Sequence, residues 1–391
     1  MLNVKVCIGL LLFSFFILGI KSYIYAQASP SSIPVNLVQQ KLKQDEALLE
    51  YFFTDSSLTI HAITTNENSV TAIKLGSVFW SSVFKFKKLL RIADLKEYSN
   101  LGQILNAFLF SPARNQLVTK KRIIIIPGEV FSGFPFEALI YCRDSSRSFS
   151  EQNKRYLIED FEIIYHFSVR HWMEHSMALS KPDIEFIGFS PVFDHHPDLN
   201  PLPYSRKEIT SIGALFKKSG HSVRMFFDQY SGKEYFKEAA SHGRIIHLAT
   251  HYLPGLLGHT CCGFLFWGYH PSQDNEVCPP GLLTHDEIGQ LKLNADLIVL
   301  NACSSGMPFG NPGRPIQSTA WFFFQAGARN ILSVLWNVTD LLANQFMVDF
   351  YKQCLSGKTY SQALREVKIK MIHKKETSLP TVWAPYIIIG Q

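Results

Sequence analysis

The sequence predicts an α/β protein whose mainly parallel sheet is flanked by helices, and two observations lead to this prediction. From about residue 121, short apolar runs alternate with segments of helical pattern, and such alternation builds parallel sheets covered on both faces. Hydrophobic residues make up 47% of the 391 residues and charged residues 18%, where globular domains average about 25% charged. This composition excludes a disordered chain and indicates a large apolar core.

The first 28 residues have the pattern of an export signal. Lys5 is followed by an uncharged apolar run, Val6 to Ile20, which is shorter than the roughly 20 residues that span a bilayer. Ala26 and Ala28 then supply the small residues of a cleavage site. We therefore expect residues 1–28 to be a signal peptide and the protein to be exported, either periplasmic or secreted. An uncleaved membrane anchor formed by residues 6–26 is the alternative, and membrane contact is expected only there.

Residues 29–120 are expected to form an N-terminal subregion, and residues 121–391 the core. Within residues 47–75, three β-rich stretches are separated by polar turns, which predicts a β-meander. Helical patterns follow to about residue 110. In the core, buried strands are predicted at 122–127, 184–190, 222–227, 244–250, 296–302 and 329–336.

Four helices of the core are expected to begin with a capping box, in which a hydroxyl side chain is followed three residues later by Glu or Gln. The pairs are Ser205 with Glu208, Ser231 with Glu234, Thr284 with Glu287, and Thr359 with Gln362. Glu287 is therefore assigned to a helix start and not to catalysis.

A histidine and a cysteine follow two of the predicted strands. His251 comes directly after the strand at 244–250, and Cys303 directly after the strand at 296–302. In an open α/β sheet, functional sites form beyond the carboxyl ends of the strands, and neighbouring strands lie about 4.8 Å apart. If these two strands are neighbours, the two side chains face each other at one edge of the sheet.

A thiol and an imidazole in this arrangement can perform nucleophilic catalysis. The thiolate is the nucleophile, and the imidazole takes the thiol proton and later gives it to a leaving amine. Small residues follow Cys303, so the backbone N–H groups of Cys303 and Tyr252 are the expected donors to a developing oxyanion. The alternative for each residue alone is structural, with the cysteine a small buried hydrophobe and the histidine a satisfied polar group.

Other chemistries find little support. His247 and His251 are four residues apart on a predicted strand, about 13 Å from each other and too far to share one ion, so His247 is expected to be a sheet residue and no metal or cofactor is expected. Six cysteines remain after residue 28, but their spacing is irregular and a core this large needs no staples. We expect Cys261 and Cys262 in a core strand and favour the absence of disulfides. The net charge of +6 is not concentrated in a long basic run, so no nucleic-acid partner is expected.

A series of ordered motifs resembles a known family. The segments are IIIIPGEVFSGFPFEAL (123–139), LPYSRKEITSIGALF (202–216), IIHLATHY (245–252), LLTHDEIGQLKLNADLIVLNACSSG (282–306), FFQAGARNILSVLWNVTD (323–340) and WAPYIIIG (383–390). Together they resemble the CHAT family of caspase-like cysteine peptidases, which belongs to the same clan as caspases, separase and gingipains. The resemblance runs from about Leu48 to Gln391 and implies a caspase-like sheet.

The resemblance implies roles for particular residues. His251 matches the family's general base and Cys303 its nucleophile. Tyr252 stands where the family often has glycine, so the backbone N–H is kept while glycine's freedom at positive φ is lost. Asn301 stands where serine is commoner. The strand after the catalytic cysteine lines the substrate pocket in such folds, which makes Trp336 a candidate pocket wall and Asp340 a candidate for selecting a basic side chain. Asp340 fits equally well in the first turn of the helix that follows.

The sequence thus predicts a cysteine endopeptidase with a Cys303–His251 dyad and an acyl-enzyme intermediate. Its partner is a protein or peptide substrate of unknown identity, and an activating protein partner is left open. A catalytically silent, caspase-like binding or scaffold protein is the alternative.

Overall fold

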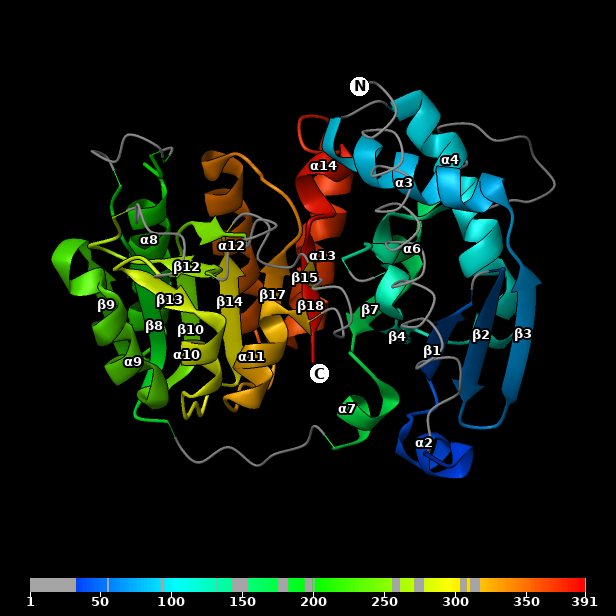
Figure 1. Ribbon diagram of the computed structural model, residues 1–391, viewed down its shortest axis with the longest axis horizontal. Coiled ribbons are helices and arrows are strands. Elements are labelled where there is room, and N and C mark those ends of the chain that lie inside the picture. The colour runs from blue at the N-terminus through cyan, green and yellow to red at the C-terminus, as the bar shows by residue number, and fades with distance from the viewer. Residues whose placement is uncertain are drawn as a thin grey trace, which may run out of the picture.

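A large sheet runs through the whole molecule, with helices on both of its faces (Figure 1). The computed structural model describes residues 33–54, 56–92, 95–131, 133–142, 154–174, 182–193, 199, 201–254, 261–270, 278–302, 308–309 and 317–390. The predicted signal peptide and anchor lie outside these residues, as does Cys303, so the predictions for them stay predictions. Among the described helices, none combines the length and apolarity needed to cross a bilayer.

The main sheet contains eleven strands in the described part of the chain. In spatial order they are β3 (Asn68–Lys74), β2 (Ser57–Thr64), β1 (Glu46–Phe53), β4 (Arg122–Ile126), β7 (Glu162–Tyr165), β18 (Tyr386–Ile389), β17 (Ile331–Val334), β14 (Leu297–Asn301), β10 (Gly243–Ala249), β8 (Ile184–Ser190) and β9 (Val223–Phe227). The pairs β1–β4, β4–β7, β17–β14, β14–β10, β10–β8 and β8–β9 are parallel. The predicted mainly parallel sheet is confirmed.

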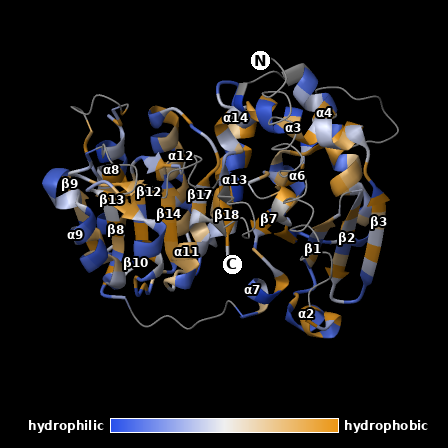
Figure 2. Cartoon of the chain, viewed as in Figure 1, coloured by the Kyte–Doolittle hydropathy of each residue, from blue (hydrophilic) through white to orange (hydrophobic). Residues whose placement is uncertain are grey.

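All six strands predicted in the core are present, because each is a short apolar run that the sheet can bury. Five of them are largely buried, while β9 lies at the edge of the sheet and is only partly buried. The predicted meander is also present: β1, β2 and β3 are antiparallel neighbours. It continues the main sheet, since β1 pairs with β4. The predicted boundary at residue 120 therefore falls between two strands of one sheet. Figure 2 shows apolar residues concentrated along these strands.

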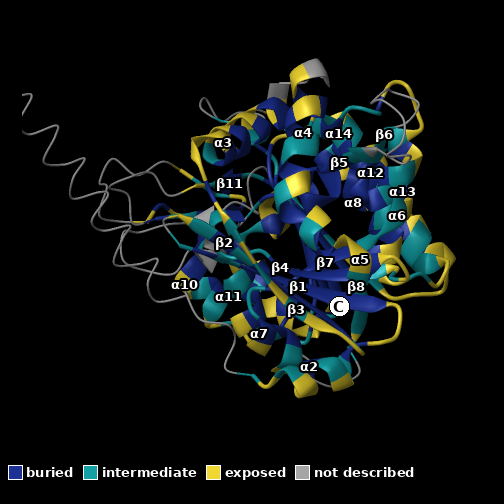
Figure 3. Cartoon of the chain, turned by 90° about the vertical axis from the view of Figure 1, so that its right-hand side faces the viewer, coloured by how far each residue is buried: buried dark blue, intermediate teal, exposed yellow. Residues whose placement is uncertain are grey.

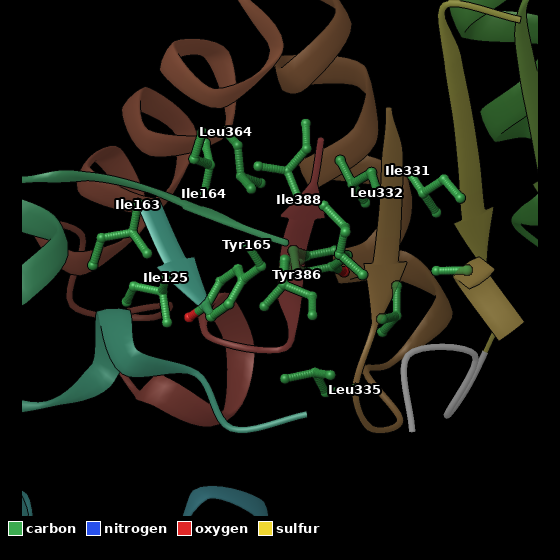
Figure 4. Close-up of a cluster of buried hydrophobic side chains, with 14 of the residues drawn as sticks. Ile125, Ile163, Ile164, Tyr165, Ile331, Leu332, Leu335, Leu364, Tyr386 and Ile388 are labelled. Atoms are coloured by element: carbon green, nitrogen blue, oxygen red, sulfur yellow. The ribbon is translucent and has the colours of Figure 1, made fainter. Parts of the chain in front are cut away.

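β18 joins the two halves of the sheet. It is antiparallel to β17, and it meets β7 at the pair Ile389–Tyr165, where the N–H of Gly390 donates to the carbonyl of Tyr165 at 3.1 Å. Tyr386 and Ile388 of β18 lie between apolar side chains of β7 and of β17 (Figure 4). The last described strand of the chain thus fills the middle of the sheet and joins its two halves.

The helices form layers on the sheet. They are α2 (Val35–Lys41), α3 (Ser77–Ile92), α4 (Leu95–Leu109), α5 (Arg114–Leu117), α6 (Leu157–Asp160), α7 (Val169–Glu174), α8 (Ser205–Lys218), α9 (Lys233–Ala239), α10 (His285–Gly289), α11 (Thr319–Gln325), α12 (Asp340–Leu355), α13 (Tyr360–Ile372) and α14 (Pro380–Trp383). α8, α12 and α13 pack side by side on one face, and α9, α10 and α11 lie on the other (Figure 1). Figure 3 shows the buried strands beneath exposed helix surfaces.

Two of the four predicted capping boxes form. Thr284 and Thr359 each accept from the N–H three residues on, and Glu287 and Gln362 reach back to the cap N–H. The prediction is wrong at Ser205, because α8 has Tyr204 as its N-cap and the Ser205 hydroxyl donates to the carbonyl of Leu202 at 2.8 Å. It is also wrong at Ser231, which lies in a 3-10 turn before α9 and donates to the carbonyl of Asp228.

Candidate functional site

The two strands that precede His251 and Cys303 are direct neighbours. β10 and β14 are parallel, and their last register pair is Ala249 with Asn301. His251 comes two residues after Ala249 and Cys303 two residues after Asn301. Cys303 lies outside the described residues, and so does its N–H, the predicted oxyanion donor. The described part of the chain nevertheless meets the condition set by the sequence, which was that the two strands be neighbours.

His251 is half-buried, and packing fixes its surroundings. Its carbonyl accepts from the N–H of Leu265 at 3.0 Å, and its ring lies 5.1 Å from the ring of Phe193 between centroids. Phe193 belongs to a small buried cluster with Cys261, Leu265 and Leu282. The imidazole therefore lies against an apolar wall, and the backbone of His251 is tied to Leu265.

A small three-stranded sheet supports this wall. It consists of β11 (Tyr252–Leu253), β12 (Gly263–Leu265) and β13 (Leu282–Thr284), all antiparallel. β12 passes so close to β13 that a Cβ on Gly263 would lie 1.9 Å from the carbonyl oxygen of Leu283. Only glycine fits at this position.

A disulfide between Cys261 and Cys278 closes the loop between these strands. This corrects the preference for a chain without disulfides. The general argument that a large core needs no staples does not apply locally, because Cys261 belongs to the small cluster beside His251, which is separate from the main core of the described residues.

Tyr252, the predicted second oxyanion donor, begins β11 directly after His251. Its side chain is buried, and its hydroxyl lies 3.2 Å from Nε2 of His285. Burial raises the pKa of this phenol well above its usual value. The bulky residue in place of the family's common glycine is thus held by a polar cluster behind the site, which also contains Thr319, whose hydroxyl lies 3.2 Å from the same nitrogen.

The same cluster contains a cysteine–histidine contact that the sequence reasoning missed. Sγ of Cys262 lies 3.2 Å from Nδ1 of His285. Burial raises the pKa of the Cys262 thiol and lowers the pKa of His285 to about 4, so both groups are neutral at physiological pH. A protonated thiol is a poor nucleophile, and this pair is therefore a packing and hydrogen-bonding element.

The two candidate pocket residues have partners within the fold. Trp336 is buried just after β17, and its indole N–H donates to the carbonyl of Thr381 at 3.0 Å. Asp340 is half-buried in the first turn of α12, as its alternative assignment required, and accepts from the N–H of Tyr204 at 2.5 Å. Burial raises the pKa of Asp340, and nearby Glu208 adds to the effect. Their substrate roles stay predictions.

Glu208, which the sequence reasoning placed in a capping box, instead contacts the two strands that lead to His251 and Cys303. Glu208 is fully buried, and its two carboxylate oxygens accept from Nδ2 of Asn301 at 2.8 and 3.0 Å. Oε1 of Glu208 also lies 2.7 Å from Nε2 of His247. His247 is a sheet residue of β10, as predicted, and its Nδ1 lies 3.0 Å from the hydroxyl of Tyr351. In the sequence, Glu208 stands out only by its spacing from Ser205, and that spacing predicted a helix cap that does not form.

A cavity of about 560 Å³ lies away from this site. It opens at the starts of the strands, where Arg122 begins β4 and Arg244 lies near the start of β10. His251 lies beyond the opposite ends of the strands, so we do not assign this cavity to the predicted chemistry. Among the described residues there is no cluster of three or more side chains able to hold a metal ion.

Three comparisons, with sequence relatives, solved structures and a family model, place the chain among known proteins. Tetratricopeptide repeat protein 28 of Homo sapiens is 25% identical over 217 residues, and its Mus musculus counterpart is 30% identical over 116 residues. These alignments cover 49% and 29% of this chain, and only 8% and 5% of the relatives. The chain thus matches a small part of these much longer proteins.

Two crystal structures of the Saccharomyces cerevisiae separase–securin complex are similar in fold, with TM-scores of 0.55 and 0.53 at 12% sequence identity. The matches cover 91% and 90% of this chain and 30% and 31% of those chains. They show that the mainly parallel sheet with flanking helices is of the caspase-like kind found in separase. The CHAT domain family model matches residues 99–391, well over half of the sequence, and the chain therefore belongs to the CHAT domain family.

Proposed function

We propose that this protein is a cysteine endopeptidase, with Cys303 as the nucleophile and His251 as the general base. The observation that carries the proposal is the register of β10 and β14, in which Ala249 pairs with Asn301. The two adjacent strands therefore end at the same height in the sheet, and each ends two residues before its candidate catalytic residue, His251 or Cys303. Membership of the CHAT domain family supports the same assignment.

The reaction has two halves. His251 takes the thiol proton of Cys303, and the sulfur forms a bond with the peptide carbonyl carbon while the carbonyl oxygen becomes negative. The carbon–nitrogen bond then breaks, and the amine leaves with the proton from His251. Water, deprotonated by His251, attacks the resulting thioester, the carbon–sulfur bond breaks, and the thiol regains its proton.

The surroundings of His251 suit this role. The ring is half-buried and lies beside the apolar ring of Phe193. The N–H of Tyr252 follows directly in the chain and would donate to the oxyanion together with the N–H of Cys303. The substrate is a protein or peptide. If the residue before the scissile bond is lysine or arginine, its basic side chain would lie near Asp340.

The test is cleavage of a diverse peptide library, read by mass spectrometry, with the purified chain and with two cysteine variants. Cys303→Ala should lower the cleavage rate by about a thousandfold or more. Cys262→Ala is the matched control: it removes the cysteine whose sulfur lies beside His285, and cleavage should persist. Lysine or arginine before the cut sites would support the role of Asp340.

The opposite pattern would refute the assignment. Cleavage that survives in Cys303→Ala and disappears in Cys262→Ala would move the nucleophile to Cys262. Absence of cleavage by the unmodified chain would favour the alternative, a caspase-like binding protein whose dyad is silent. That alternative has one supporting feature, the buried Tyr252 at a position where the family often has glycine.

A further inference from the structure

A buried polar contact connects β10 and β14, the two strands that lead to the proposed dyad, through one carboxylate. Glu208 of α8 accepts from Asn301 at 2.8 and 3.0 Å and lies 2.7 Å from Nε2 of His247. Asn301 is the last residue of β14, and His247 belongs to β10. Along the chain, Asn301 stands two residues before Cys303, and His247 stands four residues before His251.

Burial makes this contact demanding. The side chains of Glu208 and His247 are both 0% exposed, and a buried carboxylate is costly unless polar groups surround it. Tyr351 of α12 completes the group by its contact with His247. Asp340, also on α12, is a further ionisable group near Glu208, and its carboxylate accepts from the N–H of Tyr204 just before α8 begins.

Asn301 is the residue that brings β14 into this contact. A serine side chain at this position would be too short to span the distance that the asparagine amide covers. In this chain the end of β14 is therefore tied directly to α8. The geometry is independent of Cys303 itself, because every atom in the contact belongs to a described residue.

We propose that Glu208 is a positioning residue for the dyad, which holds the carboxyl ends of β10 and β14 in register through His247 and Asn301. This inference rests on the proposed function, because it gives the carboxylate a role only if His251 and Cys303 react. A misplacement of about 1 Å at a reacting group can reduce a rate by about a hundredfold. The expected consequence of loosening the tie is a less reactive thiol in a protein that is still folded.

The test follows the thiol and needs no knowledge of the substrate. The full chain is alkylated with iodoacetamide between pH 5 and 9, and the rate at each cysteine is read by peptide mass spectrometry. Cys354 of α12 serves as an internal reference, because burial raises the pKa of its thiol, so it should stay protonated and react slowly throughout this pH range. Thermal unfolding of each variant is measured in parallel.

Three variants separate positioning from stability. In Glu208→Gln an amide NH₂ replaces one of the two oxygens that accept from Asn301, so two donors oppose each other. Cys303 should then react about tenfold more slowly near pH 6.5, with its pH profile shifted toward the ordinary cysteine range near pH 8.5. Asn301→Ser removes the direct tie and should shift the profile in the same direction by less.

Glu137→Gln is the matched control. Glu137 is another buried carboxylate, paired with Lys368 outside the site, so this variant should lower the unfolding temperature and leave the Cys303 profile unchanged. If Glu208→Gln does not fold, Asn301→Ser decides the question.

Two results would overturn the inference. One is a folded Glu208→Gln with the Cys303 profile of the unmodified chain. The other is an equal shift in Glu137→Gln, which would make the effect a general loss of stability. Failure of the proposed function has a different signature: His251→Ala would then alkylate at Cys303 as fast as the unmodified chain does.

Discussion

Two carboxylates are buried in the two halves of the sheet, and their partners differ. Glu137 lies 3.2 Å from the ammonium of Lys368 and accepts from the hydroxyl of Tyr165, the last residue of β7. Glu208 has no lysine or arginine partner among the described contacts; an amide and an imidazole surround it. One half of the sheet thus contains a buried ion pair, Glu137 with Lys368. The other half contains a carboxylate, Glu208, that is bound by residues of the two strands leading to the proposed dyad.

This difference separates two uses of a buried charge. The Glu137–Lys368 pair joins α13 to the segment after β4, and each charge compensates the other where water is excluded. The Glu208 contact instead gathers groups from two neighbouring strands at their carboxyl ends. We infer that the Glu137–Lys368 pair mainly determines the stability of the packing between the two halves of the sheet. The Glu208 contact mainly determines how accurately the carboxyl ends of β10 and β14 are aligned.

The largest expected effect comes from removing the cation of the buried ion pair. Lys368→Met leaves Glu137 without its counterion in a buried place, and the free energy of unfolding should fall by about 4 kcal/mol. Urea denaturation measures it. Lys237→Met is the control, because Lys237 makes partly exposed ion pairs with Glu234 and Glu287 and its loss should be smaller, about 1 kcal/mol or less. Equal losses would show that burial is not the cause.

A somewhat smaller effect is expected when a second charge is added beside Glu208. Asn301→Asp places two carboxylates in contact, and the free energy of unfolding should fall by about 3 kcal/mol at pH 7. Like charges raise the pKa of one carboxyl in the folded state above its unfolded value. The folded variant therefore gains stability relative to the unmodified chain as the pH falls from 7 to 5. A gap between the two proteins that stays constant over this range would contradict the prediction.

The smallest effect concerns Glu287, a carboxylate that is only partly buried. Burial alone would raise its pKa, but hydrogen bonds from Lys237, the Thr284 N–H and Lys233 outweigh burial and lower the pKa to about 2. Its stabilising contribution is present above the unfolded pKa of about 4.3 and is lost as the pH falls toward 2.

Glu287→Gln should cost about 1 kcal/mol at pH 7 and flatten the pH dependence of unfolding between pH 5 and 2. Glu234→Gln, at an exposed carboxylate bound to the same Lys237, should leave that dependence nearly unchanged. If the two variants behave alike between pH 5 and 2, the cap and its two lysines do not set this part of the stability.

The sequence predicted what depends on local pattern. Apolar runs of four to eight residues identify buried strands, and the rule that sites form beyond strand ends pointed to His251. The contacts that it missed are non-local. Glu208 and Glu287 have the same local pattern, yet one turns to strands 39 and 93 residues away and the other caps its own helix. Cys262 and His285 are likewise 23 residues apart, and only the fold brings them together.

β18 has a further consequence, for the order in which the protein is made. Translation delivers residues 386–389 after every other strand of the sheet, yet β18 lies between β7 and β17. Until these residues arrive, both neighbours have open edges, which are the parts of a sheet that bind other chains. A growing chain therefore carries two half-sheets that cannot join until β18 has been made. A chain shortened before Tyr386 would keep both strand edges open to pairing with other chains.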